Sequence, residues 1–457
     1  MRIKLIWLLW LLASALAWAQ TDSSSAPADQ PATAPQTAPE SPAAPVPAPT
    51  PAMPANLTAQ IPLSPAGFEP TLDNAIGASF RVSAGYDSNA TWIGRNGGDQ
   101  EYAVRPTFLF HEIRPQGGWN LQYSPGFDAY QHDVGRSRMA HSFNGTADYS
   151  PSDRLHFHVR QDYIRSTDPF DYLDNSAPPL GVLNTPNQSI ASWDYTRLTS
   201  YAGIDYDLTA HDRMGVSATW MHYDRNGLSQ QLLYNAPQLN QDLSGSLYFA
   251  HQSSERETEG LQLGVTDMSY AGSPQRVRAY SGYYSQTVTL GLHSSFMLYG
   301  GPELTQSHYT ETVFFGLFTI PVSTSNWTPA GGLVYTWTGT RSSMHLELMR
   351  RVGEGSGLMQ SVVMTAGTAS LERQLSKNWR GHLNATGGDD IVLPSVYGRY
   401  RSLIGSAVLD RKLWGNLSSE LSYDRIYQHS NTRYYNFGNH NRVQFALIYS
   451  LTKPVGY

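Results

Sequence analysis

Residues 78–87 alternate strictly between apolar side chains and polar or small ones. Phe80, Val82 and Tyr86 are apolar, whereas Ser79, Arg81, Ser83, Gly85 and Asp87 lie between the apolar positions. Successive side chains of a β-strand point to opposite faces, so this pattern predicts a strand with one apolar and one polar face.

The same alternation recurs through the rest of the chain. It is clear in the runs that contain Trp119-Leu121-Tyr123-Phe127, Leu155-Phe157-Val159, Trp327-Leu333-Tyr335-Trp337 and Val443-Phe445-Leu447-Tyr449-Leu451. No segment after the N-terminal leader approaches the roughly 18 continuous apolar residues of a transmembrane helix. The sequence therefore predicts an all-β protein: a transmembrane antiparallel up-and-down β-barrel of about 18 strands.

Composition agrees with a barrel that faces lipid. Charged residues make up 15% of the chain, aromatic residues make up 12%, and there are 28 Tyr. Strands of about 11 residues would span roughly 28 Å when tilted, which suits the apolar band of an outer-membrane barrel. Aromatic residues fall beside the short turns and again at the opposite strand ends, so we expect two interfacial girdles.

The N-terminal region divides into two expected segments. Residues 1–19 carry Arg2 and Lys4, then an apolar core and Ala17-Trp18-Ala19, which is typical of a cleaved signal peptide. Residues 20–70 are rich in Pro and Ala, so we expect a disordered periplasmic linker, either a passive spacer or a tether for a periplasmic partner. Residues 71–457 would then form the barrel, with the C-terminus also in the periplasm.

Short motifs support a family resemblance over about residues 75–457. The strand end Tyr86-Asp87-Ser88-Asn89-Ala90, the turn at 149–153 and the aromatic final strand resemble β-barrel porins of Gram-negative bacteria. The likeness is to the "porin 2" type, which is often associated with exopolysaccharide systems. The chain ends in Tyr457, unlike the terminal Phe typical of outer-membrane proteins, although residues 443–451 resemble the signal that the barrel-assembly machinery reads.

The inward faces are the candidate functional surface. Alternation places these residues in the lumen as pore-lining candidates: Arg81, Arg105, His158, Arg160, Arg197, Arg278 and Arg442. Rings of Arg favour anions. Several Asp residues, such as Asp128, Asp162 and Asp205, should also point inward, so the alternative is that the lumen charges only satisfy one another.

Segment 307–325 is too apolar for a solvated loop. Phe314, Phe315 and Phe318 make it a candidate constriction or plug, or a contact with a neighbouring subunit. The alternative is that it lengthens two strands above the membrane, with Pro321 ending one of them.

Signatures of an enzyme, a cofactor or a metal site are lacking. The glycine-rich run 353–357 opens no helix, no G-x-S-x-G or H-E-x-x-H motif occurs, and there is no Cys. A net charge of −6 gives no nucleic-acid footprint. We therefore expect a non-enzymatic outer-membrane channel for small solutes, with anions favoured if the lumen arginines are unpaired. Its expected partners are lipid, lipopolysaccharide and the assembly machinery. The alternatives are an exopolysaccharide export component and a sealed structural or adhesive barrel.

Overall fold

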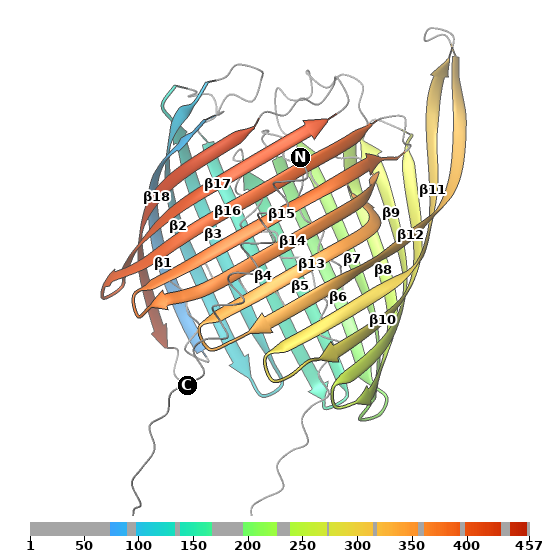
Figure 1. The fold of residues 1–457 in the computed structure, drawn as a ribbon, viewed down its shortest axis with the longest axis horizontal. Helices are drawn as coiled ribbons and strands as arrows, with labels where there is room; N and C mark the ends of the chain where they lie inside the picture. The colour runs from blue at the N-terminus through green and yellow to red at the C-terminus, as the bar shows by residue number, and fades with distance from the viewer. Residues whose placement is uncertain are drawn as a thin grey trace, which may run out of the picture. The chain divides into compact units, whose positions relative to one another are not determined.

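A computed structural model shows one closed sheet of 18 antiparallel strands (Figure 1). The structure describes residues 74–88, 97–132, 138–166, 195–225, 238–271, 274–313, 318–354, 361–393, 398–430 and 439–454. The expected signal peptide and the whole of the expected linker lie outside these ranges. Among the described residues, no helix has the length and apolarity to cross a membrane.

The strands follow one another around the barrel in chain order. They are β1 (Asn74–Asp87), β2 (Asp99–Arg114), β3 (Gly117–Tyr130), β4 (Arg138–Ser152), β5 (Leu155–Ser166), β6 (Tyr195–Asp207), β7 (Asp212–Arg225), β8 (Gln238–Ser254), β9 (Glu257–Ala271), β10 (Arg276–Thr289), β11 (Ser294–Val313), β12 (Phe318–Thr338), β13 (Ser342–Glu354), β14 (Ser361–Ser376), β15 (Trp379–Val392), β16 (Arg399–Trp414), β17 (Leu417–Ser430) and β18 (His440–Pro454). The predicted fold class and strand number are confirmed.

The barrel closes where the first strand pairs with the last. Ala75 lies opposite Pro454 and Asp87 lies opposite Arg442, so β1 and β18 pair over almost their whole lengths. Both ends of the barrel chain therefore lie at the same end as the two- to four-residue turns between β2 and β3, β4 and β5, and so on around the sheet. We call this the short-turn end and the opposite one the loop end.

Burial alternates with a period of two along the strands, as the sequence predicts. On β1, Phe80 and Val82 are exposed on the outside, whereas Ser79 and Ser83 are buried on the inside. The outer face is apolar elsewhere too, with Trp119, Leu121, Phe445 and Leu447 all exposed. Exposed apolar side chains around a closed sheet need a lipid environment, so the barrel spans a membrane.

Most of the expected aromatic girdle residues lie on this outer face. Tyr149, Tyr206 and Tyr449 are exposed near the short-turn end. Tyr86, Tyr102, Trp220, Trp327 and Tyr423 are exposed nearer the loop end. The two sets bound the apolar band, as amphipathic rings do at membrane interfaces.

Strands β11 and β12 form a hairpin that extends well past its neighbours (Figure 1). They pair without interruption from Ser294–Trp337 to Val313–Phe318. Segment 307–325 is thus mostly strand, not a loop, and Pro321 lies within β12 instead of ending it. The candidates Phe314 and Phe315 lie outside the described residues, and Phe318 is the first residue of β12.

Strand β12 separates from β13 at a level where β10 and β11 approach each other closely. The two strands pair only over Gly331–Thr338 among the described residues, although β12 continues to Phe318. At this level the β10–β11 pairing is also interrupted, between Ser281–Glu303 and Tyr284–Gly300. A Cβ atom on Gly301 would collide with the backbone carbonyl oxygen of Gly282. The backbones approach more closely here than any larger residue permits.

The lipid-facing register predicts unequal effects at adjacent positions on β3. Leu121→Arg should lower the free energy of unfolding by roughly 2–4 kcal/mol if Leu121 lies near the midplane, because it moves a charge into hydrocarbon. Gln122→Arg, on the inner face, should change it far less. Denaturant unfolding in lipid vesicles measures both, and equal losses would contradict the register.

The close approach at Gly301 predicts a second pair of outcomes. Gly301→Ala should destabilise the barrel by about 1–3 kcal/mol, because backbone must move to admit the methyl group. Gly291→Ala is the matched control: nothing lies within 4 Å of a Cβ there. It should cost about 0.5 kcal/mol or less. The same unfolding assay applies, and a neutral Gly301→Ala would contradict the close approach of the Gly301 and Gly282 backbones.

Candidate functional site: the barrel lumen

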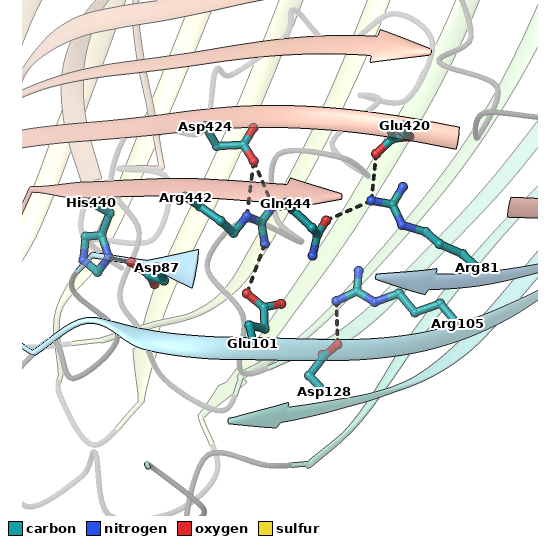
Figure 2. Close-up of polar contacts among 10 residues, drawn as sticks. All are labelled: Arg81, Asp87, Glu101, Arg105, Asp128, Glu420, Asp424, His440, Arg442 and Gln444. Atoms are coloured by element: carbon teal, nitrogen blue, oxygen red, sulfur yellow. Dashed lines mark hydrogen bonds and ion pairs between the residues drawn. The ribbon is translucent and has the colours of Figure 1, made fainter. Parts of the chain in front are cut away.

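The inner face near the β1–β18 closure carries a network of ion pairs (Figure 2). The Arg81 guanidinium on β1 lies 2.7 Å from the Glu420 carboxylate on β17, and it donates to Gln444 Oε1 on β18 at 2.9 Å. Arg442 on β18 reaches Asp424 on β17 at 3.1 Å and Glu101 on β2 at 3.8 Å. These contacts join four neighbouring strands across the closure.

Two more pairs belong to this network. Arg105 on β2 lies 3.0 Å from Asp128 on β3. His440 is fully buried, with its Nδ1 atom 3.3 Å from Asp87 Oδ1. Figure 2 shows these side chains turned toward one another on the inner face. The low solvent exposure of Asp128, Asp87 and Glu101 explains why each requires a cationic or hydrogen-bonding partner.

The wall formed by β4, β5 and β6 repeats this arrangement. Arg160 Nε lies 2.7 Å from Asp162 on the same strand. The His158 ring bridges two carboxylates, with Nδ1 2.6 Å from Asp148 and Nε2 3.3 Å from Asp205. Arg197 is buried on the inner face of β6. Sequence reasoning thus placed six of its seven lumen candidates on the inner face, and five of those six have acidic partners at the distances given.

Arg278 is the exception, because it faces outward. Its neighbours Val277 and Ala279 are buried on the inner face of β10, whereas Tyr280 is exposed on the outside. Arg278 pairs with Asp267 at 3.2 Å, beside the more exposed Arg276. The assumption that polar residues point inward fails here because the inner wall at this point is apolar.

That apolar inner wall packs against another part of the sheet. The cluster combines inward residues of β7, β9 and β10 with residues from the loop ends of β13–β15: Tyr223, Met268, Tyr270, Val277, Ala279, Val352, Val363 and Leu393. Val352 and Val363 are paired neighbours on β13 and β14. We call residues 351–353, 362–364 and 391–393 the inner leaf.

The outward-directed face of the inner leaf is covered. Along β13, Leu348 and Arg350 share one face and are exposed, and Val352 continues that face but is only 6% exposed. Along β14, Thr365 is exposed and Val363, two residues away, is 8% exposed. Side chains that would meet lipid or water elsewhere in the barrel therefore meet the inner wall of β7, β9 and β10. The leaf lies inside the barrel.

The opposite face of the leaf is apolar as well. Val362, Met364 and Val392 cluster with Met349, Ala366 and Tyr400 on the inner faces of β13–β16. Met364 and Val362 have no exposed surface. A strand segment that is apolar on both faces loses the alternation of the lipid-facing strands, and the runs Val362-Val363-Met364 and Ile391-Val392-Leu393 show this in the sequence. That signal could have identified the leaf.

The Glu303 carboxylate holds the leaf at the level where β12 no longer pairs with β13. The Val352 backbone N–H, beyond the last β12–β13 pair, donates to Glu303 Oε2 on β11 at 2.7 Å, and the contact is buried. Glu303 itself is 3% exposed. A backbone donor without a strand partner is costly when buried, so this carboxylate replaces the missing neighbour. Sequence reasoning did not single out Glu303.

The described part of the chain holds no group of three or more His, Asp and Glu residues arranged for a metal ion. No protein-family model matches the chain, and no curated protein matches it.

Solved structures show a distant similarity. Pseudomonas aeruginosa OccK2 (OpdF) is 7% identical with a TM-score of 0.42, covering 84% of this chain and 99% of that one. P. aeruginosa OccK9 (OpdG) is 10% identical with a TM-score of 0.44, covering 83% and 99%. The unliganded ferric citrate transporter FecA is 10% identical with a TM-score of 0.41, covering 82% and 64%. Because these TM-scores are low, the class of the protein rests on its own geometry: it is an 18-stranded transmembrane β-barrel.

The buried pairs of the closure predict a measurable loss of stability. Arg442→Gln should lower the free energy of unfolding by about 3–5 kcal/mol, since it leaves Asp424 and Glu101 without their cation. Adding Asp424→Asn to Arg442→Gln should restore part of the loss. Arg276→Gln, at an exposed pair, is the control and should have little effect. Equal effects of the two single changes would contradict a structural role for the network.

Proposed function

We propose that the protein is a channel of the bacterial outer membrane that passes small polar solutes. The observation that carries this proposal is the contrast between the two faces of one closed sheet. The outer face is apolar, whereas the inner face carries ion pairs from β1 to β6 and from β15 to β18. Barrels of 16–18 strands are wide enough to enclose an aqueous path.

The orientation follows from the connections. Outer-membrane barrels have short turns on the periplasmic side and longer loops outside. The short-turn end, where Asn74 and Pro454 lie, would then face the periplasm. This orientation also agrees with a linker that precedes β1 on the periplasmic side.

The paired charges argue for weak ion selectivity. An anion preference requires cationic side chains in the lumen without acidic partners. Arg81, Arg105 and Arg160 each lie within 3.0 Å of a carboxylate oxygen. We therefore expect the wild-type channel to show little preference between anions and cations. Exopolysaccharide export and a sealed barrel remain predictions from the sequence.

Planar-bilayer recording of the refolded barrel tests the proposal. Wild-type protein should give discrete conductance steps and a reversal potential near zero in a KCl gradient. Arg105→Gln leaves Asp128 unpaired and should shift the reversal potential toward cation preference, whereas Arg105→Gln with Asp128→Asn should shift it back. The shift should shrink in 1 M salt, where screening acts over about 3 Å. Correctly inserted barrels that pass no current would contradict the channel.

A further inference from the structure

We propose that the inner leaf is the size-limiting constriction of the channel, and that Glu303 on β11 is the residue that positions it. The proposal rests on the proposed function, and it assigns the constriction to β13–β15 in place of the 307–325 segment. Four features of the described residues carry it.

The first feature is the position of the leaf across the lumen. Val352 on β13 belongs to the same buried cluster as Tyr223 on β7, Met268 on β9 and Val277 on β10. In the sheet, β13 is separated from β7 by five strands. Side chains from strands so far apart can meet only where the leaf leaves the wall and crosses the interior. Because the leaf lies at the loop end of the barrel, the constriction is at the outer mouth of the channel.

The second feature is the chemistry of the leaf. The inner face of β1–β6 and β15–β18 carries Arg, Asp, Glu and His, whereas the leaf carries Val362, Met364 and Val392 on its inner face, all of them buried. The leaf narrows a polar path by its own volume, and its buried apolar side chains exclude water. Met364 is unbranched and flexible, which allows it to fill an irregular space.

The third feature is the separation of β12 from β13. With pairing confined to Gly331–Thr338 among the described residues, the loop end of β13 is free of its sheet neighbour on one side. This release permits the leaf to lie inside the barrel while β11 and β12 continue outward. The 307–325 segment belongs to that outgoing hairpin, where β11 and β12 pair with each other (Figure 1).

The fourth feature is a charged anchor. Glu303 accepts the Val352 N–H at 2.7 Å in a buried contact. The other contacts between the leaf and the wall in this cluster are apolar and so fix no direction. Glu303 therefore sets the position of the leaf, whereas the apolar cluster supplies the burial.

Thiol labelling tests the position of the leaf without relying on transport. The chain has no Cys, so each introduced thiol is unique. Val363→Cys should react slowly with a membrane-impermeant maleimide, because the side chain lies between the leaf and the wall. Thr365→Cys, two residues away and exposed, should react fast, and both should react fast after boiling. Rapid labelling of Val363→Cys in the native barrel would overturn the proposal.

Removing the anchor tests the role of Glu303. Glu303→Ala in the Val363→Cys background should speed labelling by at least about tenfold, the order expected when one hydrogen bond to a charged group is lost. Glu303→Gln keeps an acceptor oxygen and should restore slow labelling in large part. If Glu303→Ala leaves the labelling rate unchanged, Glu303 does not position the leaf.

Solute permeation tests the constriction itself. In a liposome-swelling series of neutral sugars, Met364→Ala should raise the largest size admitted, because it removes packing that holds the leaf in place. Met297→Ala is the matched control: Met297 is also buried on the inner face, in a separate cluster with Tyr299 and Val334. It should leave the size limit unchanged. An unchanged limit in Met364→Ala and Glu303→Ala, together with intact barrels, would overturn the assignment of the constriction.

The two proposals can fail separately. A wild-type barrel that admits no solute, with Glu303→Ala admitting some, would contradict the passive channel and support the leaf as the obstruction. If neither barrel admits solute, both the channel and the constriction are wrong, whatever the labelling shows. Slow labelling of Val363→Cys would then support only the placement of the leaf.

Discussion

Backbone hydrogen bonding within lipid is the constraint on which this structure depends. A strand in hydrocarbon has no water to satisfy its N–H and C=O groups, so the sheet must close on itself. The pairing of β1 with β18 supplies that closure over 13 residue pairs, from Ala75–Pro454 to Asp87–Arg442. The side-chain network of Arg81, Glu420, Arg442 and Asp424 then lies on the inner face across the same strands.

The separation of β12 from β13 has its own compensation. Beyond Gly331, β12 no longer pairs with β13 among the described residues, which leaves the Val352 N–H without a strand partner. Glu303 accepts a hydrogen bond from that N–H group, and the apolar faces of the leaf and of β7, β9 and β10 bury each other. One carboxylate and apolar packing thus compensate for the local break in the sheet, and the break brings the apolar side chains of the leaf into the lumen.

In the lumen, the effect of an arginine on passing ions depends on whether a carboxylate is paired with it. A row of arginines suggests an anion path when each residue is considered singly. Arg81, Arg105 and Arg160 each have a carboxylate oxygen within 3.0 Å, and these carboxylates come from β17, β3 and β5. In two of these three pairs the acid lies on another strand. The net field along the lumen therefore depends on pairing across strands more than on the number of cations.

The sequence by itself determined the features that depend on local periodicity. Alternation at Phe80-Val82 and Phe445-Leu447 predicted the lipid face, and short turns and aromatic positions predicted the strand number and the girdles, because both follow from a period of two and from membrane thickness. It also placed Arg81 and Arg442 inside, since polar residues opposite an apolar face must point to the lumen. Only the tertiary structure decided that Arg278 faces outward, that 307–325 continues β11 and β12, and that Val352 and Val363 lie inside the barrel. These outcomes depend on contacts between strands far apart in the chain, such as the Val352 hydrogen bond to Glu303 and the cluster that Val352 shares with Met268. A periodic pattern carries no information about which distant strand a given face will meet.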